Sequence, residues 1–234
     1  MTRLAADRDT HLTPAEIAQE ALRQFDERER EPSIRSLAAE LRVAPTAIYH
    51  HFHSQAAIYQ AVVELVWAEA TKELLRLVPK PLDAEPDDVL VAAGVAIRRV
   101  WLGHHRVARY MAATPEANEF VTSSLGLMAI LFERLGLEGE DAATCFHSYA
   151  SFMLGAVLFA ASRKSADEQL EGRGDVRFHA PYGRQAQHSS TKRTRLSIDE
   201  VMDLSVVDPA HDEELFELGL RRLVDGFVAK RPRG

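Results

Sequence analysis

Cysteine is nearly absent from this 234-residue chain, and Cys145 is the only one. A single thiol cannot form an internal disulfide, so we expect a buried structural thiol in a reduced, cytoplasmic protein. The first residues lack the apolar segment of a signal peptide. No apolar run approaches the ~20 residues of a membrane span, and we therefore expect no membrane partner.

Positive charge is scarce as well. The net charge is −7, and within the first 60 residues there is no lysine and the acidic residues outnumber the arginines. This balance argues against a general nucleic-acid coat, because sequence-independent binding to phosphates depends on cationic side chains. Catalytic signatures such as a Gly-rich phosphate loop, G-x-S-x-G, H-E-x-x-H and C-x-x-C are also missing. We expect no enzyme activity and no cofactor.

Helical periodicity is what the chain does contain. Apolar residues recur at helical spacing, and no alternating strand pattern competes, which predicts an all-α fold. We expect a three-helix domain over residues 12–60, a linking helix over 54–77, and a helical second domain over 78–230. Within the second domain, the helices are expected at about 86–102, 105–112, 116–135, 140–164 and 212–229. A polar, flexible loop should occupy 165–210, and its basic centre, 173–195, has no assigned role.

The most informative stretch is residues 33–52, which predicts two short helices joined by a tight turn. Ser33 suits an N-cap, and Pro45 suits the first position of a new helix. Two helices joined by a turn of about three or four residues form a helix-turn-helix, whose second helix enters a DNA major groove.

A family resemblance follows from the residues of this stretch. Leu37-Ala38-Ala39-Glu40-Leu41, with Val43, Pro45, Tyr49, Phe52 and Ser54, resembles the DNA-binding domain of TetR-family transcriptional regulators. The chain departs from that pattern at three positions. Arg42 replaces a turn glycine and is expected to adopt a left-handed conformation, Ala44 replaces a capping serine, and Gln55 replaces a phosphate-binding lysine.

The resemblance implies a set of DNA contacts. Tyr49 would hold a backbone phosphate, Thr46 and Ala47 would face bases, and His50 and His53 would reach phosphates or base edges. Arg35, and Gln55 in place of the family's lysine, are expected to donate to further phosphates.

Aromatic and sulfur-containing side chains gather in the predicted second domain. They suit a pocket for an apolar or aromatic small molecule, although a packed core is the simpler interpretation of each residue taken singly. The candidates are Trp101, His104, Tyr110, Met111, Phe120, Met128, Phe132, His147 and Phe152. The spacing of His104, His105 and His147 does not support a metal site.

The helices at 140–164 and 212–229 carry more apolar surface than one bundle needs. The resemblance implies a homodimer with a symmetric four-helix interface, and burial within one chain is the alternative. The candidates are Leu154, Val157, Leu158, Ala161, Leu215, Leu218, Leu223 and Phe227.

The resemblance to the TetR family implies a ligand-responsive DNA-binding regulator, most often a repressor, that is expected to release a palindromic operator when a small molecule binds. The alternative is a helical small-molecule-binding or protein-interaction module whose helix-turn-helix is vestigial.

Overall fold

The computed structural model describes residues 12–27, 31–113, 121–171 and 212–228, with side chains omitted at 111–113, 121–125, 163–171 and 228. Every regular element in these ranges is a helix, and they contain no strand. The predicted all-α fold is therefore confirmed.

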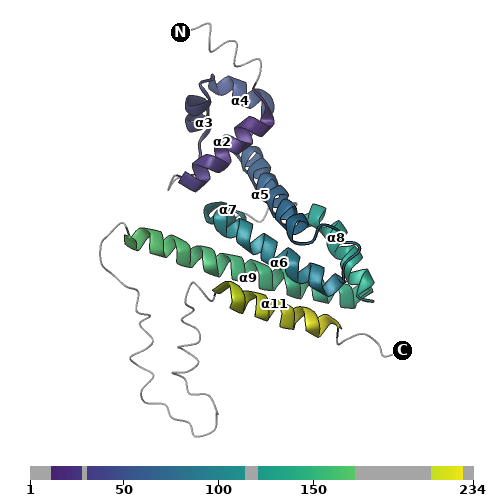
Figure 1. Ribbon diagram of the computed structural model, residues 1–234. Coiled ribbons are helices and arrows are strands. Elements are labelled where there is room, and N and C mark those ends of the chain that lie inside the picture. The colour runs from purple at the N-terminus through teal and green to yellow at the C-terminus, as the bar shows by residue number, and fades with distance from the viewer. Residues whose placement is uncertain (1–11, 28–30, 114–120, 172–211, 229–234) are drawn as a thin grey trace, which may run out of the picture.

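The N-terminal helices form a small head at one end of the molecule (Figure 1). They are α2 (Pro14–Glu27), α3 (Ile34–Leu41) and α4 (Pro45–His51). Helix α2 begins with a capping box, in which the Glu16 amide donates to Thr13 Oγ1 at 3.2 Å and the Thr13 amide donates to Glu16 Oε2 at 2.8 Å. Ser33 caps α3, as expected, with the Ser36 amide donating to its hydroxyl.

Helix α5 (Gln55–Leu77) leaves the head and runs into the body, which is the remaining part of the described chain (Figure 1). Ser54 caps it by accepting a hydrogen bond from the Ala57 amide at 3.1 Å. The body contains α6 (Pro86–Gly103), α7 (His105–Ala113), α8 (Val121–Arg134), α9 (Gly139–Glu171) and α11 (Asp212–Val228). Helices α9 and α11 lie along α6 (Figure 1).

Helix α9 is longer than the periodicity predicted. It continues to Glu171, so the expected start of the flexible loop at residue 165 is wrong. The remainder of that loop, with its basic centre at 173–195, lies outside the described residues. A polar sequence can still extend a helix that has already formed, because adding a residue to a helix costs less free energy than forming its first turn.

The apolar core runs from the head into the body without a break. Ile17, Leu37 and Ile48 of the head belong to the same buried cluster as Trp101 and Val107 of the body. Helix α5 supplies the connection, because its buried residues Ile58, Val62, Val63 and Val66 belong to this cluster. A second cluster, between α6, α8, α9 and α11, fills the far end of the body. The head is thus packed directly on the body.

One stretch of α9, Gly139–Ser162, is long and apolar enough to span a membrane by length and composition. The expectation that no apolar run reaches that length was therefore wrong. Within this stretch Cys145, Tyr149, Met153 and Val157 are buried against the rest of the body, but only 22% of the apolar window is buried. Length and composition alone do not distinguish such a helix from a membrane span.

Candidate nucleic-acid interface and ligand cavity

The turn between α3 and α4 has the geometry of a helix-turn-helix. Arg42 adopts the predicted left-handed conformation, with φ 58° and ψ 42°. Its amide donates to the Ala39 carbonyl at 3.3 Å, and the Val43 amide donates to the Ala38 carbonyl at 3.0 Å, which closes the end of α3. Ala44 makes no side-chain cap, as predicted, and Pro45 occupies the first turn of α4.

The outer face of α4 is free for contact with another molecule. Thr46, Tyr49 and His50 are exposed on this helix, and His53 is exposed just beyond its end. The Tyr49 side chain is 50% exposed, which is high for an aromatic residue of a small helical domain. These side chains share one side of α4 because positions three and four apart are neighbours on a helix.

Two of the predicted DNA contacts do not have the expected geometry. Ala47 is only 5% exposed and packs in the core beside Ile48, so its methyl group does not face outward. The side-chain amide of Gln55 donates to the Pro32 carbonyl at 3.0 Å and to the Tyr59 hydroxyl. It is therefore engaged inside the head. Arg35 is exposed near the start of α3, where a phosphate could be reached.

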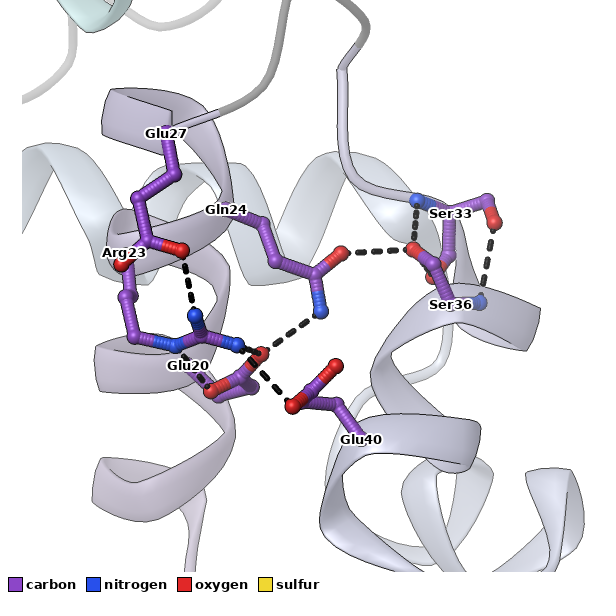
Figure 2. Close-up of polar contacts among 7 residues, drawn as sticks. All are labelled: Glu20, Arg23, Gln24, Glu27, Ser33, Ser36 and Glu40. Atoms are coloured by element: carbon purple, nitrogen blue, oxygen red, sulfur yellow. Dashed lines mark hydrogen bonds and ion pairs between the residues drawn. The ribbon is translucent and has the colours of Figure 1, made fainter.

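A polar network links α2 and α3 within the head (Figure 2). The buried Gln24 donates to Glu20 at 2.7 Å and accepts from the Ser36 hydroxyl at 2.7 Å. Arg23 lies among Glu20, Glu27 and Glu40. The hydrogen bond that it donates to Glu20 is the largest cause of the raised pKa of its guanidinium. This arginine is therefore committed to the head and not to a phosphate.

The head is fastened to the body at the junction of α6 and α7. His104 Nδ1 lies 2.9 Å from Asp26 of α2, and Nε2 lies 3.1 Å from Glu69 of α5. The hydrogen bond with Asp26 is the main cause of the raised pKa of His104. Arg106 donates to the Asp26 carbonyl at 2.8 Å and so satisfies an unpaired acceptor near the end of α2.

An aromatic cluster lies beside these polar contacts. The Tyr59 ring is 4.9 Å from Phe25 and 4.8 Å from Tyr110, measured between centroids. Burial raises the pKa of Tyr59 to about 12, and its hydroxyl donates to the Pro32 carbonyl at 2.6 Å. His104 and Tyr110 were predicted as ligand-binding residues, and both belong instead to the contact between head and body.

A cavity of about 620 Å³ opens in the body between α5, α6, α7, α8 and α9. This volume is within the range of sites for drug-sized molecules. The lining is almost entirely apolar, and Glu64 is the one charged side chain among the described residues that form it. Glu64, Ala68 and Thr71 of α5 and Leu154 of α9 are its most exposed members, so the mouth lies between these two helices.

The predicted ligand residues divide into distinct groups. Trp101 and Met128 line the cavity. Phe132 and Phe152 are packed in the core instead, with the Phe152 ring stacked on Phe216 at 5.7 Å, and His147 is exposed. Met111 and Phe120 lie outside the residues whose side chains are described.

Several lining residues were missed by the sequence analysis, and they include every residue that α5 contributes. This helix carries two apolar stripes, one toward the head and one toward the cavity. Trp67 and Leu74 belong to the second stripe of α5. They line the cavity together with Trp101 of the facing helix α6. The sequence analysis treated this helix only as the link between the two domains and assigned no ligand-binding residue to it.

The predicted dimer residues also divide. Val157, Ala161 and Phe227 are buried within the chain, which corrects their assignment to a partner surface. Leu154, Leu215 and Leu218 are exposed, and Leu158 and Leu223 are half-buried. Phe159, which was not predicted, is 65% exposed on α9. Large apolar side chains at this exposure on two neighbouring helices indicate a contact surface.

Metal binding finds no support in the described part of the chain, where no group of three or more His, Cys, Asp or Glu side chains is placed to hold an ion. The predicted burial of Cys145 as a free thiol is confirmed.

Known proteins resemble the chain over most of its length. Residues 79–231 match the family model described as the tetracyclin repressor-like C-terminal domain. The chain is 27% identical over 198 residues to the class A tetracycline repressor protein from transposon 1721 of Escherichia coli, covering 84% of this chain and 81% of that one.

Solved structures show the same fold. ActR of Streptomyces coelicolor, in complex with actinorhodin, is 22% identical with a TM-score of 0.67, covering 93% of this chain and 96% of that one. A single-substitution variant of TetR from Acinetobacter baumannii AYE, in complex with minocycline, is 20% identical with a TM-score of 0.59, covering 94% and 99%. The matched family model, the helix-turn-helix geometry and this shared fold establish that the chain belongs to the TetR family, whose members are transcriptional regulators and not enzymes.

Proposed function

We propose that this chain is a homodimeric repressor that binds a palindromic operator and releases it when a small molecule occupies the cavity in its body. The observation that carries the proposal is the outer face of α4, with Thr46, Tyr49, His50 and His53 exposed on the second helix of a helix-turn-helix. Tyr49 holds a phosphate, Thr46 meets a base edge, and the two histidines reach phosphates or bases.

The dimer is supported by the apolar surface of α9 and α11. Leu154 and Phe159 of α9 and Leu215 and Leu218 of α11 are exposed large apolar residues on two helices that pack against each other. A second copy related by a two-fold axis would cover them with the same four side chains. This dimer would present two α4 helices to successive major grooves, about one DNA turn apart.

Release of DNA is supported by the position of the cavity. Helix α5 forms part of its wall, and the same helix carries the head-facing residues Ile58 and Val62 at its other end. A ligand that favours a shifted α5 would change the separation of the two heads. Ligand and DNA would then weaken each other's binding by the same factor. Relatives of the same fold were solved with actinorhodin and with minocycline, so a body of this architecture accepts such molecules.

A gel-shift experiment tests the proposal. The purified chain is titrated on the DNA flanking its own gene, with excess nonspecific competitor. We expect a retarded band that survives the competitor and weakens with salt, and that Tyr49→Ala reduces. The matched control is His147→Ala, which removes an exposed side chain from the body. Equal binding by wild type and Tyr49→Ala would contradict the assigned contact.

A vestigial head is the second candidate, because Ala47, Gln55 and Arg23 are engaged within the head and leave few groups for DNA. In that case the chain would bind a small molecule or protein partner only. It would then show neither competitor-resistant binding nor salt dependence at any DNA concentration.

A further inference from the structure

One carboxylate lies at the mouth of the apolar cavity. Glu64 is exposed, and it is the one charged side chain among the described residues that line the cavity. Its neighbours at helical spacing on α5, which are Trp67, Ala68 and Thr71, line the cavity as well. Positions three, four and seven residues apart share one side of a helix. Glu64 therefore belongs to the side of α5 that borders the cavity.

This carboxylate differs from the other two acidic residues of α5. Glu69 lies 3.1 Å from His104, and Glu73 pairs with Arg99 at 2.6 Å. Glu64 has no ion pair or side-chain hydrogen bond among the described residues, and no cationic side chain lies three or four positions away along the helix. Its charge is therefore available to a positive group that a ligand brings to the mouth.

The interior of the cavity suits the apolar part of such a ligand. Trp101 and Met128 are buried lining residues, and the hydroxyl of Tyr149 is already engaged because it donates to the Leu90 carbonyl at 2.8 Å. A charged group taken among these side chains would lose its hydration without gaining a partner. A singly charged ligand therefore binds with its apolar part inside and its charged group at the opening, beside Glu64.

We propose that the effector is an amphiphilic organic cation, an apolar ring system that carries one ammonium group, and that Glu64 favours it over an anion of similar size and shape. This inference rests on the proposed function only in assigning the cavity to an effector. A carboxylate at the opening attracts a cation and repels an anion. Fatty acids and other organic anions are therefore disfavoured as effectors.

The test uses matched probes on the full chain without DNA. The cation is trimethyl(naphthalen-1-ylmethyl)ammonium, its neutral isostere is 1-neopentylnaphthalene, and the anion is 1-naphthylacetate. The corresponding anthracene compounds form a second, larger series. Affinities are measured by calorimetry. The fluorescence of the two tryptophans, both of which line the cavity, reports whether each probe reaches it, and competition shows whether cation and isostere share the site.

We expect the cation of at least one series to bind more tightly than the anion, and its affinity to fall as salt is added. Glu64→Gln should weaken the cation about two- to fivefold, as expected for a solvent-exposed ion pair, and leave the neutral isostere unchanged. Glu64→Lys should reverse the preference between cation and anion. The control Glu133→Gln removes an exposed carboxylate of α8 that does not line the cavity, and it should change none of these affinities.

Glu64 is exposed, so its substitution leaves the packed core untouched. The proposal is overturned if Glu64→Gln leaves the affinity for the cation unchanged, or if it weakens cation and neutral isostere equally. An anion that binds wild type as tightly as the cation, or no binding by either series, would overturn it as well.

Operator binding is measured separately by gel shift, with and without the cation. A chain that binds operator but not the cations refutes only the ligand class. A chain that binds the cation but no DNA refutes only the regulatory function. An operator that stays bound at saturating cation refutes the assignment of this ligand class to the effector.

Discussion

Replacing His104 by alanine should destabilise the protein in a strongly pH-dependent way. The imidazole bridges Asp26 of α2 and Glu69 of α5, and its pKa is raised in the folded state, chiefly by the hydrogen bond with Asp26. The ordinary value is 6.5. Because the folded pKa is higher, the stabilisation is fully present below pH 6.5 and is lost as the pH rises through the folded pKa.

The size of this loss of stability can be estimated from the solvent exposure of the three side chains. His104 is 17% exposed and Asp26 32%, so this pair is partly shielded from water, whereas Glu69, at 46%, contributes little. A hydrogen bond to a charged group contributes about 1.5–3 kcal/mol, and solvent screening places this one at the lower end. We expect His104→Ala to cost about 2 kcal/mol at pH 6 and less at pH 8.5.

Urea unfolding followed by tryptophan fluorescence measures this difference at both pH values. Taking wild type minus variant at each pH cancels the titration of other groups. His147→Ala, which removes an exposed histidine of α9, is the control and should change stability little at either pH. If His104→Ala lowers the free energy of unfolding equally at both pH values, or more at pH 8.5, the bridging role of His104 is refuted.

Three further substitutions probe the fold and the assembly. Arg42→Gly should stabilise the head by about 0.5–1 kcal/mol in urea unfolding, because φ is 58° and glycine adopts this conformation without strain. Leu218→Glu should convert the proposed dimer to a monomer in sedimentation equilibrium, and an unchanged mass would contradict the interface. Gly94→Ala should destabilise by about 1–2 kcal/mol despite the better helix propensity of alanine, since its Cβ would lie 2.3 Å from the fully buried Leu220. Gly155→Ala, where nothing lies within 4 Å, should not destabilise and serves as its control in the same unfolding assay.

Local signals in the head made its structure predictable. Thr13, Ser33 and Ser54 cap their helices through hydrogen bonds within three residues, and Pro45 fits the first turn of α4 for steric reasons. The left-handed conformation of Arg42 was expected because the family resemblance places a turn glycine at this position, and φ is 58°. Such features depend only on residues that are close in the sequence. The sequence alone is therefore enough to predict them.

It was harder to predict from the sequence which face of a helix a single side chain occupies. Ala47 was expected to face DNA because the family resemblance implied it. Helix α4 spans only Pro45–His51, which is too short for periodicity to show that this position belongs to the apolar side. Its neighbour Ile48 is also buried, so two adjacent positions contact the core. The role of Gln55 depended on Pro32, which lies 23 residues earlier in the chain.

The sequence predicted that the second domain contains a small-molecule pocket. It did not predict which residues line that pocket. Its walls come from five helices, and which aromatic residues line it depends on how those helices pack. Phe132 and Trp101 are both buried aromatic residues on amphipathic helices, yet only Trp101 lines the cavity. The stretch Gly139–Ser162 of α9 is apolar throughout much of its length, so its sequence did not separate core, cavity and partner faces.

Selection from a pool of random double-stranded DNA tests the central claim most directly, because it requires no knowledge of the operator. The full chain is bound, washed with nonspecific competitor and carried through repeated rounds, with Tyr49→Ala selected in parallel. The account predicts an inverted repeat whose half-sites are separated by about one helical turn for wild type, with weaker enrichment for the variant. A pool that remains random, or a single half-site without symmetry, would contradict a dimeric operator-binding regulator.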